Sequence, residues 1–348
     1  MTAKSPDRAA LSAAIVPRDW VQLLARYRDP DPLRSTAELA LTLVPFVGLW
    51  VVAWWALTLS GWLALAIATL NGAFLVRLFA IQHDCGHSSF FRSRTLSDWV
   101  GRGLGVLTLT PYDVWRRTHS IHHSAAGNLD ARGIGDVRTL TVREYLAMSR
   151  LGRLGYRLYR NPLVLFGLGP SYLFLLQNRL PLGLMRSGWS YWLSAMGTNL
   201  AIAFVLLAIL WFGGIWALVL IFLPTSLVAA SIGMWLFYVQ HQFEETSWDP
   251  TDGWQVHDAA LHGSSHYVLP GLLRWFSANI GVHHVHHLYA RIPFYRLPQV
   301  LADHPELADA QRLTLWQSLA CVKLQLWCEE RRRLVSMADM RTVAQAVG

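Results

Sequence analysis

The sequence predicts an all-α integral membrane protein, with four transmembrane helices that form two hairpins beneath a cytosolic helical cap. Three observations support this fold class. Hydrophobic residues make up 53% of the 348 residues and charged residues only 15%, a balance typical of membrane proteins. Four apolar runs each have about the 20 residues that span a bilayer. Basic residues avoid positions 36–76 and 189–240 altogether, which is the charge pattern of membrane spans between cytosolic segments.

Residues 1–35 are predicted to form a cytosolic or interfacial arm, because they are polar and precede the first apolar run. Residues 20–27 form a short amphipathic stretch, which ends at the Asp-Pro-Asp-Pro sequence of residues 29–32 because proline breaks a helix. This stretch suits either the lipid headgroups or ordinary docking on the protein. We expect no secretory signal, since the first apolar run begins only after some 35 residues.

The apolar runs come in two pairs, and each pair is separated only by two small, uncharged residues. Such a short separation predicts a tight helical hairpin, whose open end carries the flanking basic residues. The positive charge on those flanks places both termini and every histidine cluster on the cytosolic side, in the inner membrane if the source is bacterial. The predicted spans are residues 37–59, 62–82, 189–212 and 215–239.

The segments that follow the hairpins are predicted to be cytosolic. Residues 83–188 and 240–300 carry the histidine clusters and complete a membrane domain over residues 36–300. Two apolar stretches within the first of these regions, residues 98–110 and 162–176, are too short to span, so we expect them at the interface or buried as connectors. Residues 301–348 are predicted to form a cytosolic C-terminal helix, mainly Asp309 to Met340, with a solvated charged face near its end.

Three histidine clusters suggest a metal centre. Helical geometry places side chains at i, i+3 and i+4 on one face, so each cluster directs two or three imidazoles to one point. Eight imidazoles exceed what one tetrahedral zinc needs and suit a pair of redox metals. His241, directly after the fourth run, is a natural additional ligand; its alternative role is an interfacial histidine bonded to Glu244 or Glu245. The clusters are His83/His87, His119/His122/His123 and His283/His286/His287, with His284 inside the last.

Other chemistries lack their sequence signatures. The chain has no E-x-x-H pair of soluble di-iron proteins, no H-E-x-x-H of metalloproteases and no G-x-S-x-G serine elbow. A formal charge of +8 can attract nucleic acid, but the basic residues are not grouped into one nucleic-acid motif, so we expect membrane lipid as the partner and no nucleic acid. Three cysteines without a C-x2-C pair predict no disulfide framework.

The order H-x3-H, H-x2-H-H, H-x2-H-H with this hairpin spacing resembles the integral-membrane fatty acid desaturase family. Residues 128–141, 235–246, 263–265 and 279–281 are similar to segments of bacterial omega-6 (delta-12) acyl-lipid desaturases, so the resemblance covers roughly residues 40–300. It implies a non-haem centre of two iron ions, molecular oxygen, and two electrons from an external carrier. It also implies a ligand role for His83, His87, His119, His122, His123, His241, His283, His286 and His287.

By this resemblance we expect the protein to insert a cis double bond of omega-6/delta-12 type into a lipid-linked acyl chain, with an acyl thioester as the alternative substrate. No catalytic residue is expected beyond the metal ligands. A ferredoxin-like donor is expected on the basic face, where headgroup contact is the alternative role of the arginines. The candidate docking residues are Arg116, Arg117 and Arg132, and the candidates that support the ligands are Asp84, Asn279 and His284; His257, His262 and His266 are expected at the surface or near substrate.

Three alternatives remain open at this point. Hydroxylases, acetylenases and carotenoid ketolases share the same centre, because all begin by removing one hydrogen atom. A membrane metal transporter or sensor would use histidines as a relay, although the clusters here lie beyond the ends of the spans. A structural membrane protein with inert histidines would bind no iron.

Overall fold

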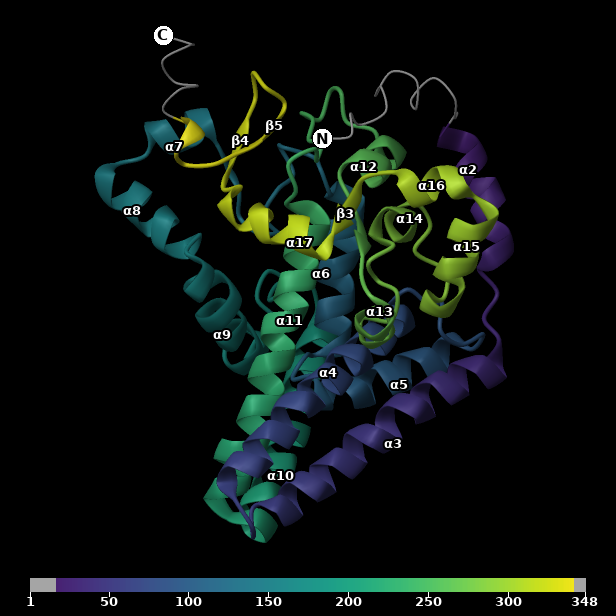
Figure 1. Cartoon of the computed structure of the whole chain (residues 1–348), viewed down its shortest axis with the longest axis vertical. Coiled ribbons are helices and arrows are strands. Elements are labelled where there is room, and N and C mark those ends of the chain that lie inside the picture. The colour runs from purple at the N-terminus through teal and green to yellow at the C-terminus, as the bar shows by residue number, and fades with distance from the viewer. Residues whose placement is uncertain (1–16, 341–348) are drawn as a thin grey trace.

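A computed structural model describes residues 17–340. The helices are α2 (Pro17–Leu24), η1 (Ala25–Tyr27), α3 (Pro32–Ala56), α4 (Gly61–Gly86), α5 (Arg94–Leu107), α6 (Tyr112–Ala125), α7 (Val142–Ala147), α8 (Arg150–Tyr159), η2 (Val164–Leu168), α9 (Gly169–Leu175), η3 (Gln177–Arg179), α10 (Trp189–Ala217), η4 (Leu218–Phe222), α11 (Leu223–His241), α12 (Val256–His262), α13 (Gly271–Phe276), α14 (His283–Leu288), η5 (Phe294–Arg296), α15 (Leu297–Asp303), α16 (Pro305–Asp309), α17 (Leu315–Ser318) and η6 (Leu319–Lys323). The long helices α3, α4 and α10 converge at one end of the molecule, and the short helices α12, α14 and α16 lie toward the other end (Figure 1).

Helices α3 and α4 are the first two candidate spans, and they coincide with the predicted runs 37–59 and 62–82. With 25 and 26 residues, each helix is about 38 Å long at 1.5 Å per residue, enough to cross a hydrocarbon core of about 30 Å. Helix α3 begins at Pro32, and the carboxylate of Asp31 caps it by accepting from the backbone N–H groups of Leu33 and Arg34.

The third candidate span is a single apolar segment of 53 residues, Trp189–His241, that joins α10, η4 and α11. As a straight helix it would extend about 80 Å, more than twice the thickness of the hydrocarbon core. The helix breaks at Gly214, where φ is 67° and ψ is −174°, a conformation that is essentially confined to glycine. The described residues therefore contain three long apolar helical segments, where the sequence predicts four separate spans.

The connection of α3 to α4 and the break in the third segment pack against each other. One hydrophobic cluster contains Ala53 and Ala68 from the first pair of helices and Ile209, Ala217 and Ile221 from the second. Figure 1 shows α3, α4 and α10 converging at the end of the long axis that lies furthest from α12, α14 and α16. The hydrophobic ends of the two helical pairs therefore support one another, and the opposite ends are free to carry the histidines.

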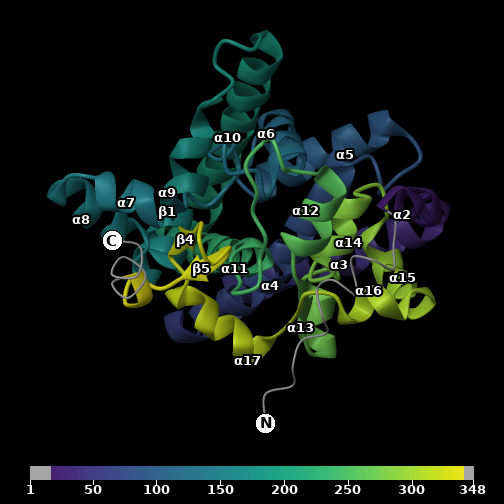
Figure 2. The same ribbon diagram turned by 90° about the horizontal axis from the view of Figure 1, so that it is seen from above.

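The N-terminal helix α2 docks on the cap. The ring of Trp20 meets His304 edge-on, with 5.3 Å between ring centroids, and the Tyr27 hydroxyl donates a hydrogen bond of 2.6 Å to Asp303. Seen from above, α2 and α15 lie together at one edge of the molecule, and α7 and α8 lie at the opposite edge (Figure 2). This packing favours the docking interpretation of the amphipathic stretch; residues 1–16 of the predicted arm lie outside the described part.

The structure is mostly helical, as predicted, and it also contains short strands that the sequence analysis did not predict. A three-stranded sheet has the order β1-β4-β5, with β1 parallel to β4 and β4 antiparallel to β5. A second sheet pairs β2 and β3 in parallel. The strands are β1 (Leu140–Thr141), β2 (His266–Val268), β3 (Arg312–Thr314), β4 (Leu326–Cys328) and β5 (Arg333–Val335).

The predicted long helix from Asp309 to Met340 is also wrong. This segment contains β3, α17, η6, β4 and β5. A capping box between Thr314 and Gln317 starts only the four-residue α17, and all three residues of β4 are buried. Because pairing with β1 and β5 satisfies the backbone of β4 and buries both of its faces, tertiary contacts override the helical periodicity. Residues 341–348 of the predicted C-terminal helix lie outside the described part.

The two short apolar stretches are connectors. Most of residues 98–110 lies in α5, whose buried face includes Gly101 and Leu104, whereas Trp99 remains exposed. The stretch 162–176 forms the π-helical η2 and then α9. Both stretches therefore bury one face against the protein and leave apolar side chains on the other.

Candidate metal centre

Four helices bring the predicted ligands together. His83 lies in the last turn of α4 and His87 caps the end of that helix, while α6 carries the second cluster and α14 the third. His241 is the last residue of α11. The long helices α4 and α11 end at this layer, and α6 and α14 bring the other two clusters to the same place.

The nine predicted ligands separate into two groups. In each group, one ligating atom from every histidine lies within 4.8 Å of all the others. The first group contains His83, His87, His119, His123 and His286, and the second contains His122, His241, His283 and His287. All nine residues singled out as ligands are therefore brought together, including His241, which lies outside the three clusters.

The spacing of the imidazole nitrogens fits a shared cation. In the first group the Nε2 atoms form the chain His87–His119–His123–His286, with successive separations of 3.0, 3.1 and 3.1 Å. The second group forms the chain His122–His241–His283–His287, with separations of 3.1, 3.0 and 3.1 Å. Two metal–nitrogen bonds of about 2.1 Å that meet near a right angle separate their nitrogens by about 3.0 Å.

Hydrogen bonds between the rings cannot account for this arrangement. A neutral imidazole nitrogen either carries one proton or offers one lone pair, yet the Nε2 of His119 faces two other Nε2 atoms at close range. A cation bound to all of the lone pairs satisfies every nitrogen at once. The donor set therefore fits one metal ion in each group.

The two groups adjoin each other. The rings of His123 and His287, which belong to different groups, are stacked with centroids 4.1 Å apart. His283 and His286, also from different groups, are 5.4 Å apart. Ions held by the two groups would therefore be neighbours that share one reaction space.

Burial keeps the rings in the form that binds metal. Desolvation, followed by repulsion from neighbouring histidines, holds the pKa of His119, His123, His286 and His287 well below the ordinary histidine value of 6.5. A group whose pKa is lowered in this way is neutral at pH 7. Metal binding requires the unprotonated nitrogen, so these histidines are ready to act as ligands.

Asp136 is a supporting residue that the sequence analysis missed. Its Oδ1 atom lies 2.6 Å from Nδ1 of His122, so the proton of His122 is held on Nδ1 and Nε2 is left free for metal. Gly135 adopts φ = 78°, and a Cβ atom there would approach Cβ of His122 to 3.1 Å, so glycine lets the loop close on the helix. The loop has no periodicity, and only the neighbouring Gly-Asp pair signals the turn.

The three predicted supporting residues mainly hold the cap. Asp84 accepts a 2.7 Å hydrogen bond from the backbone N–H of Phe294, and its other oxygen lies 3.5 Å from Nδ1 of His83. The Asn279 amide donates to the carbonyl of Phe294 at 3.2 Å. His284 belongs to neither group; burial lowers its pKa to about 3, and its neutral ring donates to the carbonyl of Leu307 at 2.8 Å.

The remaining histidines lie apart from both groups. His266 contacts the carbonyl of Ala308 through Nδ1 at 2.6 Å, and His262 pairs with Asp258 at 3.4 Å. His257 is half-buried and belongs to neither group. None of the three adds a ligand to the centre.

The candidate docking arginines differ in their partners. Arg116 forms an ion pair of 2.6 Å with Asp98, and Arg132 forms one of 2.7 Å with Glu144. Arg117 is exposed and forms none of the ion pairs found within residues 17–340. Of the three, Arg117 therefore offers the least compensated positive charge.

Aromatic side chains close the centre toward the apolar helices. Trp115 stacks on His119, with ring centroids 4.8 Å apart and an interplanar angle of 13°. Phe237, one turn before His241, lies 5.3 Å from His122. These rings limit the access of water and give the centre an apolar surface on this side.

Comparison with known proteins agrees with this geometry. The model of the family "Fatty acid desaturase" matches residues 60–319. A fatty acid desaturase of Bacillus subtilis is 41% identical over 321 residues, which cover 92% of this chain and 90% of the relative. An sn-1 acyl-lipid omega-3 desaturase (ferredoxin) of Synechocystis is 28% identical, and the match covers 83% of this chain and 81% of the relative. An sn-1 oleoyl-lipid 12-desaturase of Synechocystis is also 28% identical, and the match covers 85% of this chain and 83% of the relative.

The family match includes all three histidine clusters, His241 and the two candidate spans α4 and Trp189–His241. Long apolar helices and a histidine-rich centre are the features that a membrane-bound oxidoreductase of this kind requires. The chain is a membrane protein and an enzyme, and it belongs to the fatty acid desaturase family.

Proposed function

We propose that the protein inserts a cis double bond into an acyl chain of a membrane lipid, using molecular oxygen and two electrons at a pair of iron ions. The observation that carries this proposal is the division of nine histidines into adjoining groups of five and four. An imidazole-rich pair of irons would supply oxygen activation and the removal of hydrogen from an unactivated C–H bond.

The residues of the chain have defined tasks in this proposal. The nine histidines hold the metals and leave no carboxylate among the ligands of either group. Asp136 fixes the orientation and tautomer of His122. Trp115 and Phe237 keep water from the reacting carbon and guide the chain toward the centre.

A lipid-linked acyl chain is the substrate we propose, and the position is of omega-6 (delta-12) type. Two Synechocystis relatives are named as acyl-lipid enzymes, one as an omega-3 and one as a 12-desaturase. Both relatives are equally similar to this chain, so they favour neither position of the double bond. The proposed position depends instead on residues 128–141, 235–246, 263–265 and 279–281, which resemble segments of omega-6 (delta-12) desaturases. An acyl thioester is the alternative substrate for the same centre.

We propose a ferredoxin-like protein as the electron donor. One relative is named with ferredoxin, and the exposed, unpaired Arg117 lies on the helix that carries His119. Reversing its charge with Arg117→Glu should raise the KM for the donor, and the effect should weaken at high ionic strength. An unchanged KM would remove Arg117 from the docking surface.

For the topology, we propose that residues 36–300 form the membrane domain and that the segment Trp189–His241 crosses the bilayer twice, with its turn at Gly214. The non-helical Gly214 and the length of the segment support this reading. The basic flanks favour an inner membrane location with both termini and the active site in the cytosol.

The function is tested by expressing the protein in a host whose lipids contain only saturated and mono-unsaturated chains, followed by gas chromatography–mass spectrometry of the fatty acids. A new double bond in lipid-linked chains supports the proposal. A hydroxylated or ketone product without a new double bond would assign the centre to a related membrane oxygenase. Purified enzyme supplied in turn with lipid and with acyl thioester separates the two substrate classes.

A further inference from the structure

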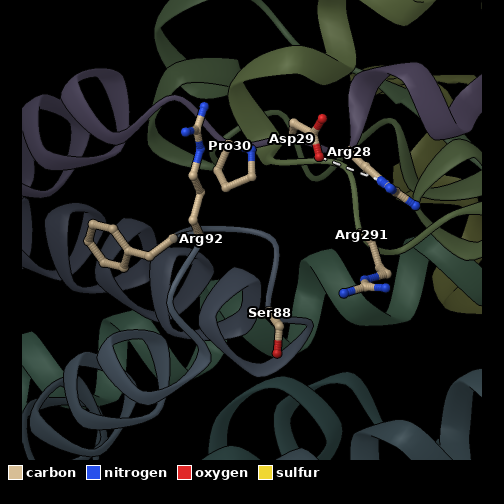
Figure 3. A pocket seen from close by; sticks show the side chains of 7 residues that line it. Arg28, Asp29, Pro30, Ser88, Arg92 and Arg291 are labelled. Carbon is tan, nitrogen blue, oxygen red and sulfur yellow. Dashed lines mark ion pairs between the residues drawn. The ribbon is translucent and has the colours of Figure 1, made fainter.

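A cavity of about 580 Å³ is lined by residues that are close in sequence to two of the histidine clusters. It is formed by three segments that are distant in sequence: the connection from η1 to α3, the loop after α4, and the loop after α14 (Figure 3). Its volume falls within the range of about 300–1,000 Å³ that is typical of small-molecule sites. The lining residues are Arg28, Asp29, Pro30, Ser88, Phe91, Arg92 and Arg291.

The lining is strongly positive. Arg28, Arg92 and Arg291 contribute one guanidinium each, and all three side chains are exposed. Asp29, the one acidic residue of the lining, lies 3.5 Å from Arg28. Three positive charges against one negative charge leave a net charge of +2, so the cavity favours an anion.

The residues that line the cavity are close in sequence both to the first candidate span and to two of the histidine clusters. Pro30 precedes the start of the first candidate span at Pro32 by two residues. Ser88 follows the ligand His87 directly, and Arg291 follows the ligand His287 by four residues. A ligand in the cavity would therefore lie at the level where lipid headgroups meet the protein, next to loops that extend from two of the histidine clusters.

We infer that this cavity binds the headgroup phosphate of an anionic phospholipid whose acyl chain enters the metal centre. The inference rests on the proposed function, because it assigns the recognition of a lipid substrate. Guanidinium groups bind phosphate oxygens in bidentate fashion. A protein donor is the weaker occupant, since a stable protein contact needs about 800 Å² on each partner, whereas this site is a hollow that suits one small group.

Binding is measured in the absence of oxygen, so that turnover does not enter. The full-length enzyme is placed in nanodiscs of a neutral glycosyl diacylglycerol that contain a trace of labelled phosphatidylglycerol, and bound lipid is quantified by native mass spectrometry. Replacing Arg92 and Arg291 together by Gln should weaken the binding of phosphatidylglycerol about tenfold or more, as expected for lost charge-assisted hydrogen bonds. The double Lys variant, which keeps the charges, should retain most of the affinity and shows that the loop tolerates substitution.

Arg150→Gln is the matched control, because Arg150 is exposed at the start of α8 and lies outside the cavity. It should bind phosphatidylglycerol as the wild type does. The inference is overturned if the double Gln variant binds normally, if Arg150→Gln loses as much affinity, or if the loss falls instead on the KM for the electron donor. Equal binding of water-soluble glycerol phosphate and of phosphatidylglycerol would assign the cavity to a free phosphate and also overturn it.

Fatty-acid analysis of the same preparations separates this inference from the proposed function. Wild-type enzyme that forms a double bond but binds lipid independently of Arg92 and Arg291 refutes the headgroup site alone. Wild-type enzyme that binds phosphatidylglycerol through these arginines but forms no double bond refutes the function alone.

Discussion

His122 and His123 are neighbours in sequence but belong to different groups of ligands. Adjacent side chains on a helix point about 100° apart, whereas residues at i and i+4 share a face. His119 and His123 therefore join the first group, and His122 is directed to the second. On α14 the same rule sends His283 and His287 to the second group and His286 to the first. The pattern H-x2-H-H thus allows a single helix to contribute histidines to both groups.

Removing one ligand from the first group should empty the centre. We expect His123→Ala to lose bound iron and to form no desaturated product, because a buried group of neutral ligands loses its geometry with one member missing. Elemental analysis and gas chromatography–mass spectrometry measure the two effects. His257→Gln is the control, since His257 belongs to neither group, and it should retain both iron and product. Iron and activity that survive His123→Ala would contradict the ligand assignment.

The contact of Asp136 with His122 should influence metal affinity without supplying a ligand. We expect Asp136→Ala to lower metal affinity or activity about 10–100-fold, which is typical for residues that orient a metal-bound histidine. Competition with a chelator measures the affinity. The matched control is Asp130→Ala on the same loop, whose carboxylate accepts from the backbone N–H of Thr251 at 2.8 Å and contacts no ligand. Equal affinities in the two variants would exclude the positioning role.

At the scale of elements, the helices of the membrane part and the cap are shaped by different forces. Helices α3 and α4 form because their sequences are continuously apolar, and the N-cap at Asp31 fixes where α3 begins. The segment after Thr314 follows from partners elsewhere in the chain, because Trp327 stacks on Trp248 with centroids 5.3 Å apart and β4 pairs with β1. Such contacts between distant residues outweigh the weak local preference for a helix.

The break at Gly214 gives a prediction about the third apolar segment. Gly214→Ala should destabilise the protein by about 1–3 kcal/mol, because its φ of 67° with ψ of −174° is costly for any residue with a Cβ atom. No atom lies within 4 Å of the added Cβ, so the cost belongs to the backbone alone. Thermal unfolding in detergent measures it.

Gly233→Ala is the control for this prediction, since Gly233 lies within α11 and also has open space around its Cβ position. Replacing a glycine inside a helix by alanine raises the free energy of unfolding by about 0.5–1 kcal/mol. Equal stability of the two variants would show that Gly214 does not have the non-helical backbone conformation at which the segment breaks.

At the scale of the whole molecule, the apolar turns lie at one end and the histidine groups lie away from it. The connection between α3 and α4 packs against the region around Gly214, while α6, α11 and α14 deliver their ligands to the opposite end (Figure 1). The candidate metal centre therefore lies at the end of the molecule opposite the apolar turns.

The proposed orientation is tested by labelling introduced cysteines. The three native cysteines are buried, so they contribute little background. Thr58→Cys, in the exposed connection between α3 and α4, should react with a membrane-impermeant thiol reagent only in right-side-out vesicles. Ser149→Cys, exposed before α8, should react only in inside-out vesicles. The reverse pattern would place the histidine layer outside the cytosol.

Headgroup anchoring has a consequence for the position of the double bond. If the arginine-lined cavity holds the phosphate, a constant path separates it from the histidines, so the enzyme counts carbons from the carboxyl end. We expect palmitoyl and stearoyl phospholipids to receive the double bond at the same distance from the ester. Mass spectrometry of derivatised products locates it. A constant distance from the methyl end would show that the depth of the acyl tunnel, not the headgroup, sets the position.

Much of the site can be predicted from local sequence. The choice of these nine histidines as candidate ligands rests on spacing along single helices, on the place where an apolar run ends, and on a family resemblance, and the structure brings all nine together. The expectation that the rings of His119, His122 and His123 converge on one point is wrong, because His122 joins the second group. Helical periodicity predicts only that residues at i and i+4 share a face. It does not predict Asp136, which lies fourteen residues after His122 and reaches it only because Gly135 lets the loop turn back.

The sequence by itself determined the long apolar helices and which histidines are candidates for a metal centre, because composition and periodicity are encoded locally. Only the tertiary structure decided how the nine histidines divide into five and four, how the C-terminal segment forms strands, and that Arg28, Arg92 and Arg291 share one cavity. These features depend on contacts between residues far apart in the chain, which form when the helices pack and which no local pattern records.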